Sequence, residues 1–157
     1  MLKKITALAA VILLSGCSGQ SGEPDALEKS FKASLTLSEG FAAEAERVEG
    51  SGWNYTLTEP ESVKGLEITL LSEGKCVVSI GEHSTVYERS ELPRYAPLDL
   101  LSSALDMCIE GKGVKTSVNG EKTVRTGTVR GVGFTVTSSG GKPSEVSFNG
   151  GMTAEIS

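Results

Sequence analysis

The sequence predicts an α+β domain that is mostly β-sheet, and three observations lead to this prediction. Apolar and polar residues alternate with a period of two along much of the chain, which is the pattern of half-buried strands. Strong helical spacing is confined to one segment, residues 97–109. Glycine and the β-branched residues are abundant, with 19 glycines in 157 residues, and glycine clusters separate the alternating segments as turns do.

We expect six strands before the helix. In residues 31–37, four apolar side chains alternate with Lys32, Ser34 and Thr36. The same alternation recurs downstream, interrupted by glycine turns and once by a proline-containing segment. The expected strands are residues 31–37, 41–46, 53–58, 66–70, 76–80 and a more polar strand at 84–88. A short helical start is expected at residues 25–29.

Residues 97–109 predict the one long helix. Pro97 suits the first helical turn, and Gly111 suits the C-terminal cap. Apolar residues at helical spacing define the face that we expect to pack on the sheet, namely Leu98, Leu101, Ala104, Leu105 and Cys108. The polar residues Asp99, Ser102, Ser103 and Asp106 are expected away from that face.

Strands resume at Val114 after the helix. Asn119-Gly120 predicts a two-residue hairpin with a type I′ turn, because both residues tolerate a positive φ. Three more alternating segments are expected to complete the sheet, with a loop at residues 138–142: they are 132–136, 145–148 and 153–156.

The N-terminus predicts a membrane anchor. Lys3 and Lys4 precede an apolar run of about ten residues, which is the layout of a secretory signal and too short to span a bilayer. The run ends in Leu14-Ser15-Gly16-Cys17, which resembles the lipobox of bacterial lipoproteins. That resemblance implies cleavage before Cys17 and a diacylglyceryl thioether on its sulfur, with further acylation (palmitate) of the lipoprotein type. The alternative is a buried helix that ends in Ser-Gly-Cys.

Three segments follow from this interpretation: a signal peptide at 1–16, a lipidated cysteine and tether at 17–29, and one β-rich domain at 30–157. Two acyl chains hold a protein stably at a membrane. We therefore expect a location at the cell membrane or outer membrane, facing the extracellular or periplasmic side. The sequence leaves open whether the envelope has one membrane or two, and it leaves the oligomeric state open.

Composition argues against nucleic acid as a partner. The formal net charge is −5, and it becomes more negative once the two lysines of the signal are removed. A mildly acidic domain without basic clusters lacks the electrostatic footprint of a nucleic-acid binder.

No catalytic, cofactor or metal constellation is evident, so the sequence predicts a protein that is not an enzyme. His83 is the single histidine and lies in a polar stretch. The two S-x-x-K matches, at Ser72–Lys75 and Ser139–Lys142, fall in glycine turns, whereas that nucleophile motif needs the start of a helix. Glu44, Glu46 and Glu49 could form a carboxylate cluster for calcium, but the first two alternate with apolar residues and are better explained as the solvated face of a strand.

Two cysteines remain beside Cys17. In an exported protein, Cys76 and Cys108 are a candidate disulfide. Both fall on apolar faces, however, and buried free cysteine is common as a small hydrophobe. The sequence leaves both alternatives open.

Three local features carry a resemblance to a known superfamily. They are Gly52-Trp53 at the start of a strand, Glu59-Pro60 followed by Gly65-Leu66-Glu67-Ile68, and Gly141-Lys142-Pro143 before a late strand. Together with the order of strands, one inserted helix and more strands, they resemble the lipoprotein carrier superfamily, which includes the periplasmic lipoprotein chaperone, its outer-membrane receptor and an envelope-stress sensor.

This resemblance implies a curved antiparallel sheet, a half-barrel, with the helix packed on its concave face. It also implies a lipid, acyl chain, lipoprotein or apolar peptide as the ligand between helix and sheet. The residues expected to line such a cavity are Phe31, Ala33, Ala43, Trp53, Tyr55, Leu101, Ala104, Leu105 and Phe134. The small residues would leave space in this region, and the aromatic ones would fill it.

Two functional hypotheses follow. The first is a membrane-anchored, non-enzymatic protein that binds a lipid or apolar ligand. The second is a structural, interaction or envelope-sensing module whose core is filled by its own side chains and which acts through a protein partner.

Overall fold

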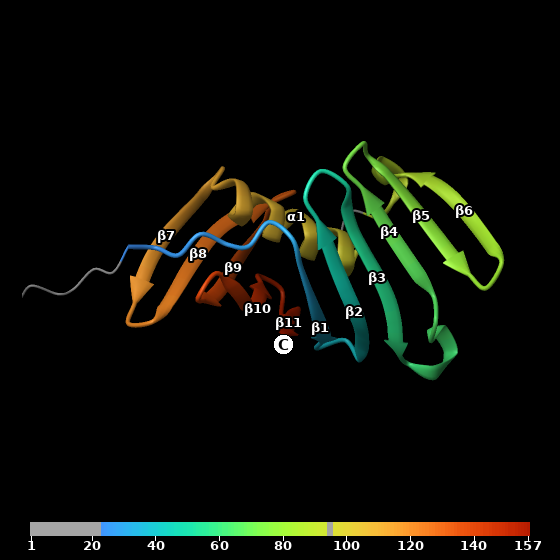
Figure 1. Ribbon diagram of the computed structural model, residues 1–157, viewed down its shortest axis with the longest axis horizontal. Helices are drawn as coiled ribbons and strands as arrows, with labels where there is room; N and C mark the ends of the chain where they lie inside the picture. The colour runs from blue at the N-terminus through green and yellow to red at the C-terminus, as the bar shows by residue number, and fades with distance from the viewer. Residues whose placement is uncertain (1–22, 94–95) are drawn as a thin grey trace, which may run out of the picture.

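The computed structural model describes residues 23–93 and 96–157 of the chain. Within this part, 11 strands form one open, curved antiparallel sheet, accompanied by one α-helix (Figure 1). The prediction of a mostly β fold with one main helix is therefore confirmed. The predicted signal peptide and the lipidation of Cys17 lie outside the described residues.

The strands and helices have the following bounds. The strands are β1 (Phe31–Leu37), β2 (Phe41–Val48), β3 (Gly52–Glu59), β4 (Glu67–Leu71), β5 (Lys75–Ile80), β6 (His83–Glu88), β7 (Val114–Asn119), β8 (Lys122–Val129), β9 (Val132–Ser139), β10 (Lys142–Phe148) and β11 (Thr153–Ile156). The α-helix is α1 (Pro97–Glu110), and the two 3-10 turns are η1 (Glu61–Val63) and η2 (Arg89–Glu91).

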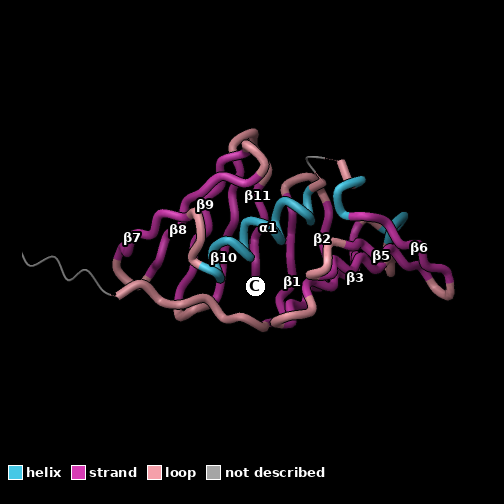
Figure 2. The backbone as a smooth tube through the Cα atoms, turned by 90° about the horizontal axis from the view of Figure 1, so that it is seen from above, coloured by secondary structure: helices cyan, strands magenta, loops and turns pink. Residues whose placement is uncertain are grey.

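The sheet consists of two consecutive meanders joined at their inner strands. Its order is β6-β5-β4-β3-β2-β1-β11-β10-β9-β8-β7, and the junction pairs Leu35 on β1 with Ile156 on β11. Helix α1 connects β6 to β7, which are the two outermost strands. The connection must therefore return from one end of the sheet to the other, and α1 runs across the strands as it does so (Figure 2).

Each expected strand is present, and several are longer by one to three residues than the alternation indicated. The expected helical start at residues 25–29 is wrong, because this segment is neither helix nor strand and bends at residues 29–30. Tertiary contacts replace helical ones here: the backbone N–H of Glu28 donates to the carbonyl of Gly141 at 2.9 Å, and Leu27 is buried in the core.

The hairpin at residues 119–120 is confirmed, but its expected turn type is wrong. Asn119 still pairs with Lys122, so the two central residues are Gly120 and Glu121. Only Gly120 has a positive φ, at 65°. A single positive φ at the first central position is the type II′ geometry, for which glycine is preferred.

Helix α1 begins and ends as expected. Pro97 occupies the first turn, and Gly111 adopts the left-handed conformation with its N–H donating to the carbonyl of Met107. The expected polar face is wrong for two residues, because Asp99 and Ser102 are as buried as the leucines. Their burial is tolerated because each has polar partners on the sheet or its loops, which offsets the loss of water.

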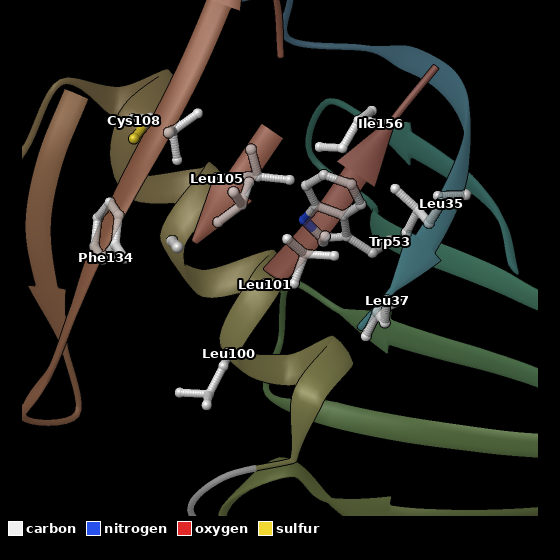
Figure 3. Close-up of a cluster of buried hydrophobic side chains, with 14 of the residues drawn as sticks. Leu35, Leu37, Trp53, Leu100, Leu101, Leu105, Cys108, Phe134 and Ile156 are labelled. Carbon is white, nitrogen blue, oxygen red and sulfur yellow. The ribbon is translucent and has the colours of Figure 1, made fainter. Parts of the chain in front are cut away.

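The core lies between α1 and one face of the sheet (Figure 3). Leu101 and Leu105 of the helix pack among Leu35, Trp53 and Ile156 from the inner strands. Cys108 and Phe134 lie in the same cluster. One continuous apolar core therefore joins both meanders to the helix.

Candidate functional site

The centre of the core is filled by aromatic side chains. The rings of Trp53 and Tyr55 stack in parallel with centroids 5.8 Å apart, and Phe31 packs edge-on against Trp53 at 5.6 Å. Trp53 and Tyr55 are almost completely buried. The small residues that were expected to leave space, such as Ala43 and Ala104, are buried as well.

An apolar pocket of about 240 Å³ lies beside this centre, where the start of α1 faces β3, β4 and β5. It is lined by Leu37, Phe41, Leu57, Ile68, Leu70, Cys76, Val78, Leu92, Ala96, Pro97, Leu98 and Asp99. None of the nine residues expected to line a ligand cavity lines this pocket. Stacking of Trp53 on Tyr55 fills space between the helix and the sheet, where the resemblance placed a ligand.

The pocket has a buried floor and a partly exposed rim. Leu70 and Cys76 are each 1% exposed and form part of the floor. Phe41 is exposed to 37%, and Ile68 and Leu92 are partly exposed. A small apolar group can therefore reach the floor from solvent by passing side chains that are themselves apolar.

Asp99 is the one charged residue in the lining of this pocket, and it is 1% exposed. It forms ion pairs with Arg89, from η2, and with Arg130, from the turn between β8 and β9. Arg89 also donates from Nη2 to the hydroxyl of Ser103 at 3.3 Å. The first turn of α1 is thus joined to two segments from opposite meanders.

A second, polar pocket of about 480 Å³ adjoins the first. It is lined by Arg89, Ser90, Leu92, Ser103 and Arg130. Leu92 lines both pockets, and Asp99 lines the apolar one while pairing with both arginines of the polar one. The two hollows are therefore neighbours, one apolar and one carrying two guanidinium groups.

The backbone of Arg130 is unusual. Among the described residues it is the only non-glycine residue with a positive φ, at 51°, and Gly131 follows with a φ of 83°. Val129 pairs with Val132, so these two residues are the centre of a two-residue hairpin turn. Two positive φ values correspond to type I′, in which asparagine or glycine normally occupies the first position. This arginine was not predicted as a functional residue, because its only signal in the sequence is the glycine that follows it.

Polar contacts also hold the middle of α1. The hydroxyls of Tyr55 and Ser102 lie 2.6 Å apart in the core, and Ser102 donates to the carbonyl of Leu98 at 2.7 Å, so Tyr55 is the donor to Ser102. Asp106 accepts from Trp53 Nε1 at 3.0 Å and from Arg47 Nε at 2.9 Å. These bonds hold the helix over the aromatic centre in one position.

Cys76 and Cys108 are both buried free thiols, so the disulfide alternative is wrong for this structure. Cys76 lines the apolar pocket together with Asp99, which is at the start of α1. Cys108 lies nine residues further along the same helix than Asp99. Nine helical residues span about 13 Å, well beyond the reach of a disulfide. Burial raises the pKa of Cys108 to about 11, and burial and then Asp99 raise the pKa of Cys76.

Residue types that bind metals do not gather into a site in the described part of the chain. His83 is exposed on β6, and no group of three or more histidine, cysteine, aspartate or glutamate side chains is placed to hold a metal ion there. The same part contains no helix that is both long and apolar enough to cross a bilayer. The apolar pocket with its neighbouring arginines remains the strongest candidate.

Comparison with known proteins does not assign the chain to a family. No protein-family model matches the sequence, and no curated protein matches it significantly.

Proposed function

We propose that this protein is a membrane-anchored, non-enzymatic binding protein of the bacterial cell envelope, and that its apolar pocket receives an alkyl chain. The observation that supports this most strongly is the pocket between α1 and strands β3 to β5, which has an apolar floor and an apolar, partly exposed rim. Burial of apolar surface is the main driving force for such binding.

We further propose that α1 lies on the concave face of a half-barrel. Four consecutive residues at the start of the helix, 99–102, are all buried. Successive helical residues point about 100° apart, so four in a row cover the whole circumference. A flat sheet covers only one side of a helix, so coverage of this turn by strands together with Arg89 of η2 and Arg130 of the β8–β9 turn supports a sheet that curves around α1. A helix in this position forms one wall of the pocket.

The volume of the pocket limits what it can hold. At about 240 Å³ it exceeds the cavities of about 150 Å³ that bind benzene, yet it is smaller than the ~300 Å³ at which sites for drug-sized molecules begin. It suits part of one alkyl chain. A buried segment of roughly eight methylenes contributes about 6 kcal/mol, against an association cost of about 4–15 kcal/mol. Tight binding therefore requires polar contacts in addition.

The proposed anchor is compatible with this role. Between Cys17 and Glu23 there are six peptide links, which span at most about 20 Å. The segment after Glu23 is fixed to the β8–β10 part of the sheet through Asp25 (Figure 1). A lipid on Cys17 would hold the domain close to the membrane, where single-chain amphiphiles are available.

The experiment is photo-crosslinking of the full chain in lipid nanodiscs with dodecanoic acid that carries a diazirine near its methyl end. We expect saturable labelling of residues on β4, β5 and the start of α1. The variant Val78→Phe places a ring into the pocket and should reduce this labelling at least fivefold, because a filled apolar pocket has no room for the chain.

Val77→Phe is the matched control, since Val77 neighbours Val78 on β5 and its side chain points to the opposite face of the sheet. Labelling should be unchanged in this variant. Equal labelling in both variants, or none in the wild type, would contradict an alkyl-chain site.

One observation favours a second candidate, the interaction module. Strand β6 is an outermost strand, and Ile80, Val86 and Tyr87 at this end of the sheet are exposed large apolar residues. A free strand edge with exposed apolar side chains can pair with an extended segment of another protein. A wild-type chain that folds but shows no saturable labelling of the pocket would favour this candidate.

A further inference from the structure

We propose that Arg89 and Arg130 form a head-group site next to the apolar pocket, so that the ligand is a single-chain amphiphile with an anionic head, a carboxylate or a phosphate. This inference rests on the proposed function, because it takes the apolar pocket as the site of the tail. It adds the chemical class of the head group, which the apolar side chains of the pocket do not indicate.

The two pockets are placed as such a ligand requires. Leu92 lines both, and Asp99 in the lining of the apolar pocket pairs with the two arginines of the polar pocket. An alkyl chain that lies along Ile68 and Leu98 and leaves the pocket past Leu92 would bring its head group to the guanidinium groups. Ser90 and Ser103 add hydroxyl groups to the same lining.

The local charge favours an anion. The charged residues that line the two pockets are Arg89, Arg130 and Asp99, so this lining carries more positive than negative charge, in a protein whose overall formal charge is −5. Guanidinium groups present five donors in a planar fork that matches carboxylate and phosphate oxygens. The same charge would disfavour a cationic head. The side chains of Arg89 and Arg130 are 19% and 31% exposed, so both guanidinium groups are accessible from solvent.

The backbone of Arg130 supports a role for its side chain. A non-glycine residue at positive φ carries a conformational cost that asparagine or glycine would reduce. The chain nevertheless has arginine at this turn position, and its guanidinium points to Asp99 and the polar pocket. Strain of this kind is concentrated at functional sites.

The test uses the full chain in nanodiscs and two photoreactive probes of equal chain length, dodecanoic acid and dodecanol. We expect the acid to label the apolar pocket about tenfold more efficiently than the alcohol. The carboxylate of the acid is charged and can accept hydrogen bonds from the arginines, whereas the hydroxyl of the alcohol is neutral. In Arg130→Asn, which keeps a residue suited to positive φ, labelling of the pocket by the acid should fall to the level of labelling by the alcohol. In Arg130→Lys, which keeps the charge, most of the preference should remain.

Lys115→Gln is the control for loss of a positive charge, since Lys115 is exposed on β7 and lies outside both pockets. It should leave the preference intact. Non-reactive dodecyl phosphate should compete with the acid probe, whereas acetate at the same concentration should not. That pair distinguishes an amphiphile site from a site for small anions.

The outcomes separate this inference from the proposed function. Equal labelling by acid and alcohol in the wild type, or an acid preference that survives in Arg130→Asn, would overturn the head-group site and leave the alkyl-chain site standing. Competition by acetate as strong as that by dodecyl phosphate would also overturn it. Absence of pocket labelling by either probe would overturn both.

Discussion

Asp25 shows how a single side chain fixes the segment that leads to the proposed anchor. Its carboxylate accepts from the backbone N–H of Gly141 at 2.5 Å and lies 3.5 Å from Arg125 Nη2. Arg125 is itself 5% exposed and donates to Ser138 at 2.7 Å. Gly141 suits this contact because a β-carbon there would lie 2.8 Å from the carbonyl oxygen of Ala26. The segment is thus held by partly buried polar contacts.

These contacts give stability a defined dependence on pH. Burial acts to raise the pKa of Asp25, but hydrogen bonds from Thr123 and Gly141 and the charge of Arg125 outweigh it, and the pKa is lowered from 3.8. As the pH falls, the unfolded state takes up the proton first. The contribution of Asp25 is therefore complete well above pH 3.8 and is lost as the pH falls below it.

We expect Asp25→Asn to lower the free energy of unfolding by roughly 1–3 kcal/mol near neutral pH and by much less in acid. Urea unfolding of both proteins over a series of pH values measures this difference. Glu23→Gln removes an exposed charge from the same segment and serves as the control. A difference between Asp25→Asn and wild type that stays constant down to low pH would contradict this account.

Among single residues, the burial of polar side chains was the least predictable from the sequence. Asp99 and Ser102 looked like solvent-facing helix positions, and their burial depends on Arg89, Arg130 and Tyr55. These partners are far from them in the chain or carry no pattern of their own. Local periodicity reports where an apolar face lies, but it does not report which polar side chain has a partner across the core.

At the scale of elements, prediction from the sequence was more successful. Each expected strand is present, because alternation is a local property that survives in the folded sheet. The end of α1 at Gly111 is also local, since the left-handed cap needs only glycine at that position. The pocket was not predictable in this way. Leu92 and Ala96 belong to an irregular connection, and the filled centre results from the stacking of Trp53 on Tyr55 across neighbouring residues of one strand face.

Helix α1 provides the prediction at this scale. Leu101 is completely buried between the helix and the sheet, so Leu101→Asp should lower the free energy of unfolding by several kcal/mol, because it places an unpaired charge in the core. Urea unfolding monitored by circular dichroism measures the loss.

Glu110→Asp is a matched control at the exposed end of the same helix, where the change should cost little. A loss below about 0.5 kcal/mol in Leu101→Asp would be typical of a surface position and would contradict the packing of α1 on the sheet.

In the whole molecule, α1 connects the two ends of the sheet, and the two meanders make different contacts. The meander from β7 to β11 holds the N-terminal segment through Arg125 and Gly141. The meander from β1 to β6 supplies the strand residues that line the apolar pocket. Arg130 and Arg89 join the two at the start of the helix. The contacts of the N-terminal segment and the proposed binding site are thus located on different parts of one sheet.

In the function proposed above, an alkyl chain occupies the pocket beside the filled centre of the core. The most direct measurement is a crystal structure of the protein with dodecanoic acid bound. We expect the chain of the ligand to lie between Leu57, Ile68 and Leu98, with its carboxylate near Arg89 and Arg130. Density for the ligand elsewhere on the molecule, or an apolar pocket closed by its own side chains in the presence of the acid, would contradict the account.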